Sequence, residues 1–130
     1  MPLVRITPQA GKPPDYRRAL ADNVHQALVE CFAVPPTDRF QTLHELAAEA
    51  MIIDRDYLGG PRSADFVLIE ITAGRPRSTV QKQALYRCLS ERLQASPGIS
   101  PADVMVVIST TQSEDWSFGH GIASLLTQPA

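Results

Sequence analysis

Residues 2–7, PLVRIT, return 65 positions later as residues 67–72, VLIEIT, and this repeat decides the predicted fold. The same offset aligns the two halves without a gap. Identical pairs include Leu20 with Leu85, Leu28 with Leu93, Pro36 with Pro101, and Asp38 with Asp103. Such unbroken register indicates an internal duplication, in which each half carries the same strand, helix and turn.

Each half contains an apolar stripe at helical spacing. The first stripe predicts a helix from about residue 15 to residue 33, after the breaker Pro13-Pro14. The second predicts a helix over residues 78–95, which Ser78 and Gln81 open as a capping box. We interpret both stripes as core.

Short β-rich runs at residues 66–71 and 104–108 complete two β-α-β units. The predicted fold class is therefore α/β (α+β), with a four-stranded mixed sheet and two helices on one face. The other face of the sheet and its edges then need cover from a partner, which favours an oligomer. We divide a single domain, residues 1–130, into halves of about 2–43 and 66–110. Residues 44–65 form the linker, with a short helical pattern at 46–50.

Composition narrows the classes of function. A net charge of −2, with no basic run among the 130 residues, argues against nucleic acid or an anionic membrane as partner. Two cysteines without a Cys-x-x-Cys motif favour a reduced, metal-free protein. With no secretory signal pattern and no long apolar run, we expect a cytoplasmic protein that does not span a membrane.

Pro2 follows the initiator methionine, so removal of Met1 leaves a secondary amine at the start of a strand. An α-amino group titrates near neutrality and can serve as acid, base or nucleophile. Parallel pairing within the first unit places Asp38 near Pro2. The alternative interpretations are plain methionine trimming for Pro2 and a structural turn for Asp38.

Arg75 and Arg77 follow the strand of the second half and flank Pro76, which favours an extended backbone. Two guanidiniums two residues apart can then face one way, and we predict that they clamp a substrate carboxylate. They precede a helix N-terminus, where a cation is unfavourable unless an anion is bound. The alternative is a solvated pair on a surface loop.

Besides the N-terminal Pro2 and the duplicated fold, the sequence contains three motifs: Thr-Asp-Arg at 37–39, Arg-Pro-Arg at 75–77 and Asp-Trp-Ser-Phe-Gly at 115–119. With these motifs the chain resembles the malonate semialdehyde decarboxylases of the tautomerase superfamily over nearly its whole length. The resemblance implies a homotrimer with no cofactor and an active site at each amino terminus. His120, where that family would have a basic arginine, and the middle insert depart from the pattern.

The resemblance implies catalytic roles for Pro2, Asp38, Arg75 and Arg77. It also implies an apolar pocket wall from Trp116 and Phe118, which we extend to Leu125, in a C-terminal pocket segment at 111–130. Packing of the aromatic side chains against a neighbouring subunit is the alternative. Because His120 stands between two glycines, we expect it to lie on an exposed loop rather than to act as a general base.

The expected reaction is cofactor-independent decarboxylation of a small 3-oxo acid, malonate semialdehyde to acetaldehyde and CO2, with possible hydratase side activity. Pro2 would act as a cation, which the negative charge of Asp38 would keep protonated, or as a Schiff-base amine. Three alternatives remain open: a keto-enol tautomerase, a 3-haloacrylate dehalogenase or hydratase, and a non-catalytic trimeric binding protein.

Overall fold

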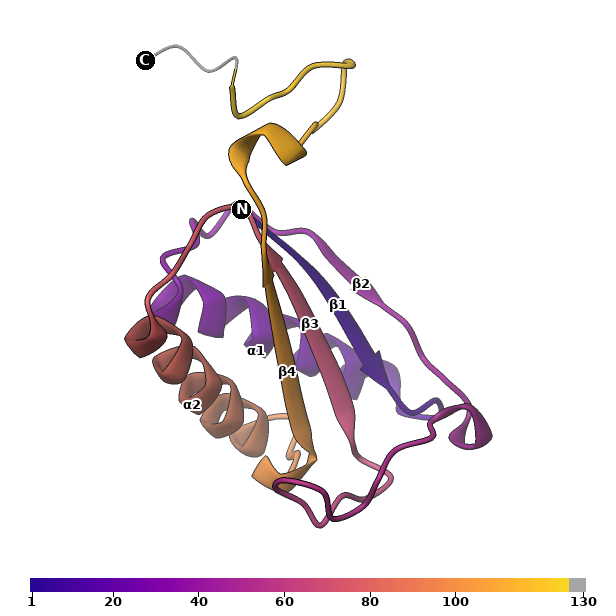
Figure 1. Ribbon diagram of the computed structural model, residues 1–130. Helices are drawn as coiled ribbons and strands as arrows, with labels where there is room; N and C mark the ends of the chain where they lie inside the picture. Colours follow the sequence, from indigo (N-terminus) through magenta and orange to yellow (C-terminus); the bar gives the residue numbers. More distant parts are fainter. Residues whose placement is uncertain (127–130) are drawn as a thin grey trace.

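The two halves of the chain fold as two β-α-β units, as the repeat predicts (Figure 1). The computed structural model describes residues 1–126. The first unit consists of β1 (Pro2–Pro8), α1 (Pro14–Cys31) and β2 (Gln41–Leu43), and the second of β3 (Val67–Ala73), α2 (Thr79–Ala95) and β4 (Val104–Thr110). Three short 3-10 turns are η1 (Ala48–Ala50), η2 (Pro101–Asp103) and η3 (Ser113–Asp115).

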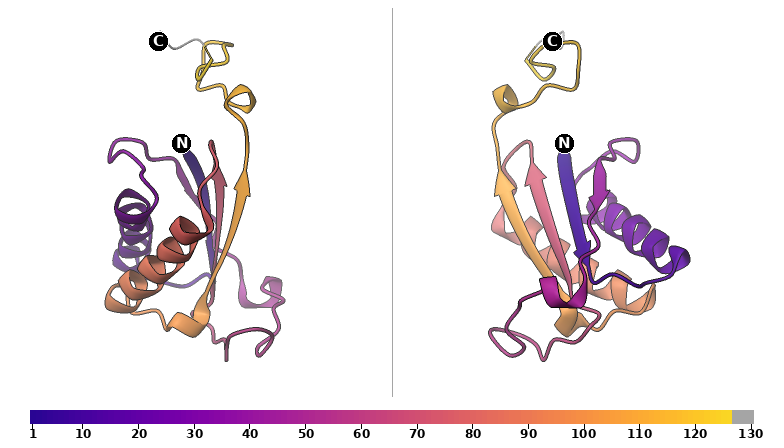
Figure 2. Two further views of the ribbon diagram at one scale, coloured as in Figure 1. Left: turned by 60° about the vertical axis from the view of Figure 1, so that its left-hand side comes forward. Right: turned by 90° about the vertical axis from the view of Figure 1, so that its right-hand side faces the viewer.

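The strands form one mixed sheet in the order β2-β1-β3-β4. Pairing is parallel inside each unit and antiparallel between β1 and β3, where Pro2 lies opposite Ala73. Both helices cover the same face of the sheet (Figure 2). This topology brings the start of β1 and the end of β3 to one edge, together with the residues that precede β2.

The core lies between the helices and the inner face of the sheet. In β1, Val4 and Ile6 are buried while Leu3 and Arg5 point outward, and β3 alternates in the same way. From the helices, Leu20, Leu28, Leu85 and Leu89 are at most 1% exposed. The duplicated apolar stripes are therefore core, as predicted, and the four-stranded fold is confirmed.

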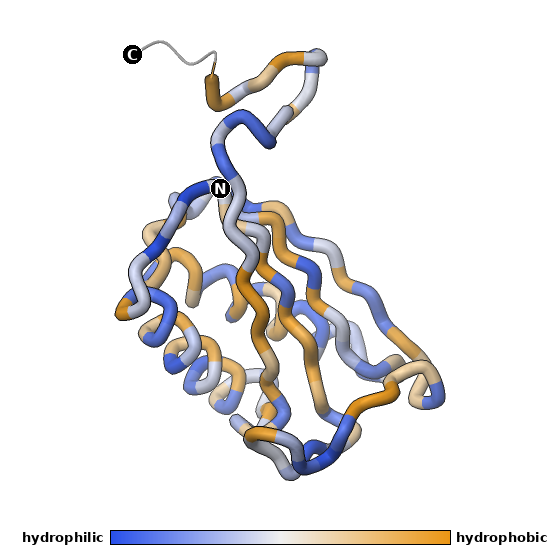
Figure 3. The backbone as a smooth tube through the Cα atoms, viewed as in Figure 1, coloured by the Kyte–Doolittle hydropathy of each residue, from blue (hydrophilic) through white to orange (hydrophobic). Residues whose placement is uncertain are grey.

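The outer face of the sheet is uncovered in the protomer, although β4 is rich in hydrophobic residues (Figure 3). Leu3, Met105 and Val107 are each 45% exposed there. The nearly continuous apolar strands predict cover on both faces, and a single chain provides it on one face only. None of the helices in residues 1–126 is long and apolar enough to cross a membrane.

The ends of the elements differ slightly from the prediction. α1 starts at Pro14, because proline is compatible with a first helical turn, and ends at Cys31, because Ala33 has a left-handed φ of 53°. The capping box of Ser78 and Gln81 is present at the start of α2. The expected helix at 46–50 is a single 3-10 turn, since Leu46 still pairs with β1 through Pro8.

Cys88 lies on α2, where it faces α1, and its thiol contacts the carboxylate of Glu30 at 3.7 Å. Burial, together with Cys31 and the negative charge of Glu30, raises the pKa of the Cys88 thiol to about 12. Because the thiolate is the reactive form, we expect Cys88 in the native protein to react with iodoacetamide at pH 8.5 far more slowly than in the unfolded chain. Peptide mass spectrometry at timed intervals measures this difference. Equal rates in both states would contradict the burial of the thiol.

Candidate active site

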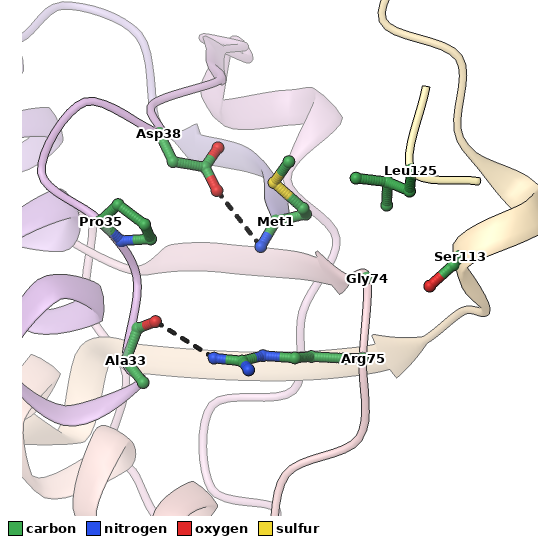
Figure 4. Close-up of a pocket in the computed structure, with 8 residues that line it drawn as sticks. All are labelled: Met1, Ala33, Pro35, Asp38, Gly74, Arg75, Ser113 and Leu125. Atoms are coloured by element: carbon green, nitrogen blue, oxygen red, sulfur yellow. Dashed lines mark hydrogen bonds and ion pairs between the residues drawn. The ribbon is translucent and has the colours of Figure 1, made fainter. Parts of the chain in front are cut away.

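A pocket of about 380 Å³ opens at the edge where β1 begins and β3 ends (Figure 4). It is lined by Met1, Ala33, Pro35, Asp38, Gly74, Arg75, Ser113 and Leu125. These residues come from four places in the chain: the amino terminus, the α1–β2 loop, the β3–α2 loop and the C-terminal segment. Three of the predicted site residues, Asp38, Arg75 and Leu125, therefore lie around one cavity.

Asp38 ends a turn that its own backbone closes, with the Asp38 N–H donating to the Pro35 carbonyl at 3.0 Å. Its side chain is only 10% exposed and forms an ion pair of 3.2 Å with the amine of Met1. Within residues 1–126, neither carboxylate oxygen accepts a hydrogen bond. A buried carboxylate with so few partners is costly, unless a cation in the pocket compensates it.

The duplicated aspartate provides the contrast. Asp103, in the second half, is 2% exposed and accepts hydrogen bonds from the backbone and the hydroxyl of Ser63, both at 2.6 Å. Its carboxylate is therefore satisfied by the linker and serves structure. Asp38 occupies the same place in the repeat and faces the pocket instead.

The amine beside Asp38 belongs to Met1, not to Pro2. Pro2 is buried in β1, and its nitrogen is part of the Met1–Pro2 peptide bond, while the Met1 carbonyl accepts from the Gly74 N–H at 2.7 Å. Gly74 permits this close approach, since a Cβ there would lie 2.8 Å from the Met1 Cβ. The predicted contact of Asp38 with the start of β1 is present, one residue earlier than Pro2.

The guanidiniums of Arg75 and Arg77 do not lie side by side on the pocket, as the predicted clamp requires; whether both bind substrate stays a prediction. Arg75 is exposed on the pocket, with one bond of 3.4 Å to the Ala33 carbonyl. Arg77 is 9% exposed and does not line the pocket. Its guanidinium donates to the Phe32 carbonyl at 2.8 and 3.2 Å and to the Arg75 carbonyl at 3.1 Å, and lies 4.3 Å from the Phe32 ring centre.

The end of α1 holds the Arg77 guanidinium away from the pocket. Carbonyls at a helix C-terminus lack helical partners and carry partial negative charge, which attracts a guanidinium. Burial and the positive charge of Arg75 lower the pKa of Arg77, and the negative charge of Asp38 opposes this shift. Arg77 thus supports the two loops that carry Ala33 and Arg75.

The C-terminal segment projects beyond the sheet, past the amino terminus (Figure 1). Its aromatic side chains stack on one another: Trp116 and Phe118 have ring centres 5.7 Å apart and an interplanar angle of 12°, and Phe118 contacts Phe40 at 5.5 Å. Neither aromatic lines the pocket, although the Trp116 indole nitrogen would lie 3.4 Å from a Cβ on Gly74. They stand beside the pocket, and Leu125 forms its apolar wall.

His120 is exposed and has a left-handed φ of 60°, between two glycines that also have positive φ. It does not line the pocket. Residues 127–130 of the predicted C-terminal pocket segment lie outside the described residues. Among the residues that are described, no group of three or more His, Cys, Asp or Glu side chains could hold a metal ion.

Sequence reasoning missed Ser113, Ala33 and Pro35 as pocket residues. Ser113 lies three residues after the end of β4. Thr111 prolongs the pairing of β4 with β3, because its N–H donates to the Ala73 carbonyl at 2.9 Å. The parallel register of these strands could have indicated that residues just after β4 reach this edge.

Comparison with known proteins gives the family. Two family models match the chain, at residues 38–119 and 2–60, and both are described as tautomerase enzyme. Two proteins of Bacillus subtilis (strain 168) match over nearly their whole length. Probable tautomerase YrdN is 39% identical over 127 residues, 98% of each chain, and probable tautomerase YusQ is 32% identical over 126 residues, 97% of this chain and 99% of the other. The chain belongs to the tautomerase superfamily.

Several solved structures of the same fold are similar to this chain. Malonate semialdehyde decarboxylase superposes with a TM-score of 0.90 at 37% identity, over 96% of both chains. A second malonate semialdehyde decarboxylase, inhibited by 3-bromopropiolate, has a TM-score of 0.89 at 37% identity, over 96% of this chain and 95% of the other. A symmetric trimer of fused 4-OT has a TM-score of 0.79 at 24% identity, over 97% of this chain and 99% of the other, and shares the fold.

Proposed function

We propose that the protein decarboxylates a small 3-oxo acid, with malonate semialdehyde as the expected substrate and acetaldehyde and CO2 as products. The observation that carries the proposal is the buried Asp38 carboxylate, paired at 3.2 Å with the amine at the head of the chain in a pocket that also contains Arg75. The 37% identity to malonate semialdehyde decarboxylases supports the same reaction.

The reaction breaks the bond between the carboxylate carbon and C2 of the substrate. CO2 leaves, and the electron pair of that bond passes to C2 and the adjoining carbonyl group, giving an enolate that a proton converts to acetaldehyde. A cation at the carbonyl oxygen stabilises the developing charge. Arg75 binds the substrate carboxylate and orients the bond to be broken. Correct orientation of reacting groups can lower a barrier by as much as about 7–11 kcal/mol.

Removal of Met1 gives the Pro2 amine the place beside Asp38. The negative charge of Asp38 favours the protonated, cationic form of that amine. A second route is condensation of the amine with the aldehyde, with loss of water, to an iminium that accepts the electron pair. Borohydride added during turnover distinguishes the two routes, because reduction of an iminium leaves a stable added mass on Pro2.

The remaining predicted residues take supporting roles in this proposal. Leu125, with Trp116 and Phe118 nearby, excludes water from the pocket and strengthens the electrostatic effect of the amine. Arg77 acts through Arg75 and Phe32, whose carbonyls it binds, rather than by touching the substrate. Asp38 could also orient a water molecule, which would support hydratase side activity.

A substrate panel tests the proposed function. Purified protein of verified intact mass is incubated with malonate semialdehyde and with 2-oxo acids, their enols and 3-haloacrylates, and products are followed by NMR. We expect acetaldehyde to form fastest. Faster ketonisation of the enols would instead support a keto-enol tautomerase. Both relatives from Bacillus subtilis are named as probable tautomerases. No turnover of any compound would favour a binding protein.

We further propose that the protein is a homotrimer that covers the outer face of the sheet, as the fused 4-OT neighbour forms a symmetric trimer. Val107 lies on that face and is 45% exposed. Val107→Glu is expected to shift the protein from trimer to monomer at micromolar concentration, because a buried unpaired carboxylate is strongly unfavourable. Light scattering after size exclusion measures the mass.

Val80→Glu is the matched control for this experiment. Val80 is 73% exposed on α2, at the helical face of the protomer, so the same change should leave the trimer intact. A wild-type protein that elutes as a monomer, or a trimer that persists in Val107→Glu, would contradict the proposed assembly.

A further inference from the structure

His25 is a buried histidine that the proposed reaction does not use. It lies on α1, is 5% exposed, and its Nε2 atom is 2.8 Å from the carbonyl oxygen of Pro36. A carbonyl only accepts hydrogen bonds, so Nε2 carries the proton and donates it. The bond connects the middle of α1 to the turn that ends in Asp38.

The turn needs this connection because Asp38 has little else to hold it. Its carboxylate oxygens accept no hydrogen bond from residues 1–126, and its ion pair is with the terminal amine that it has to face. Its position then depends on the backbone of residues 35–38, whose internal bond runs from the Asp38 N–H to the Pro35 carbonyl. The bond from His25 fixes that turn relative to the core.

The other links between α1 and this loop lie before or after the turn. The Val34 N–H donates to the Leu28 carbonyl at 3.3 Å, one residue ahead of Pro35. Arg39 pairs with Asp22 at 2.8 Å, and both side chains are exposed, where ion pairs contribute little. Gln41 donates to the Ala21 carbonyl at 2.8 Å, after β2 has begun. Of these contacts, the one from His25 reaches the turn itself.

We infer that His25 is a positioning residue: its Nε2–H bond to Pro36 holds the turn of residues 35–38, so that the Asp38 carboxylate faces the amine in the pocket. The inference rests on the proposed function for its effect on catalysis. Its effect on the turn is independent of which reaction the protein catalyses.

Two conservative variants test the inference. The side-chain amide of His25→Gln can place an N–H close to the position of Nε2, whereas that of His25→Asn is one methylene shorter and cannot reach Pro36. Both are polar and remove the same ring. The two variants therefore differ in whether they can donate a hydrogen bond to the Pro36 carbonyl, while both lose a similar amount of packing.

Catalysis gives the first measurement. With the Met1-free protein and malonate semialdehyde, we expect His25→Asn to lower kcat by about 10- to 100-fold with little change in KM, since a small displacement of a catalytic group has effects of this size. We expect His25→Gln to stay within about threefold of the wild type, a difference of less than about 1 kcal/mol. Equal losses in both variants, or none in either, would overturn the inference.

Hydrogen exchange gives the second measurement, which needs no activity. The Asp38 amide should exchange faster in His25→Asn than in the wild type and in His25→Gln. Val24→Ala, a core change next to His25 on α1, controls for general destabilisation. In this variant the protection of the Asp38 amide should fall by no more than the loss of global stability accounts for. Unchanged protection of Asp38 in His25→Asn would refute the positioning role. An inactive wild-type protein whose exchange follows this pattern would refute only the proposed reaction.

Discussion

A form of the protein that keeps Met1 is expected to decarboxylate malonate semialdehyde at least about 10³-fold more slowly than the form that begins at Pro2. In the Met1 form the Pro2 nitrogen is part of a peptide bond, so it carries neither a positive charge nor a reactive lone pair. The Met1 amine takes its place beside Asp38, and the Met1 side chain lies in the pocket (Figure 4).

The two forms can be prepared from one sequence. Proteolytic removal of an amino-terminal tag with complete release of Pro2 gives one, and expression with the host methionine aminopeptidase inhibited gives the other. Intact mass verifies each form, and circular dichroism verifies that both fold. Equal turnover would show that the Met1 amine also serves, and would make the assignment to Pro2 wrong.

Arg75→Ala is expected to lower kcat/KM for malonate semialdehyde by about 10²- to 10³-fold, the usual range for loss of one charged group that contacts the reacting substrate. Arg75 is exposed, and within residues 1–126 its guanidinium makes a single hydrogen bond, of 3.4 Å, so the melting temperature should hardly change. Arg75→Lys keeps the charge but loses the planar pair of donors, and should recover only part of the activity.

Arg77→Ala is the contrasting variant. It leaves the Phe32 carbonyl without its guanidinium partner, and an unsatisfied buried carbonyl costs about 1–3 kcal/mol of stability. We therefore expect a lower melting temperature, with a loss of activity that follows from displacement of Arg75. If Arg75→Ala instead destabilises the fold, or Arg77→Ala abolishes substrate binding in a stable protein, the roles given to the two arginines must be exchanged.

The repeat predicted most of the fold from local patterns. Apolar side chains recur along a helix every three to four residues, and this spacing located α1 and α2 within two residues at each end. The 65-residue offset then gave the two-unit sheet, since equal sequences favour equal units. The linker was less predictable. The pattern at 46–50 indicated a helix, but Leu46 forms an isolated parallel bridge with Gln9, just after β1, and only a 3-10 turn follows.

The pocket was predictable only in part. Topology placed Asp38, Arg75 and the start of β1 at one edge, because strand direction fixes which ends meet. The direction of a side chain is a different matter. Arg77 has the same neighbours in sequence as a clamp would have, yet its guanidinium binds a carbonyl 45 residues away.

The amino-acid sequence alone determined the duplication, the order of the strands and helices, and the family to which the chain is similar. Hydrophobic spacing and turn residues act over a few positions, so they can be read without coordinates. The tertiary structure decided three contacts. The Met1 amine pairs with Asp38, Arg77 binds the carbonyl at the end of α1, and His25 donates to the carbonyl of Pro36 in the turn that ends in Asp38. Each of these contacts joins segments that are distant in sequence, so the position of the side chain depends on competing partners and on burial.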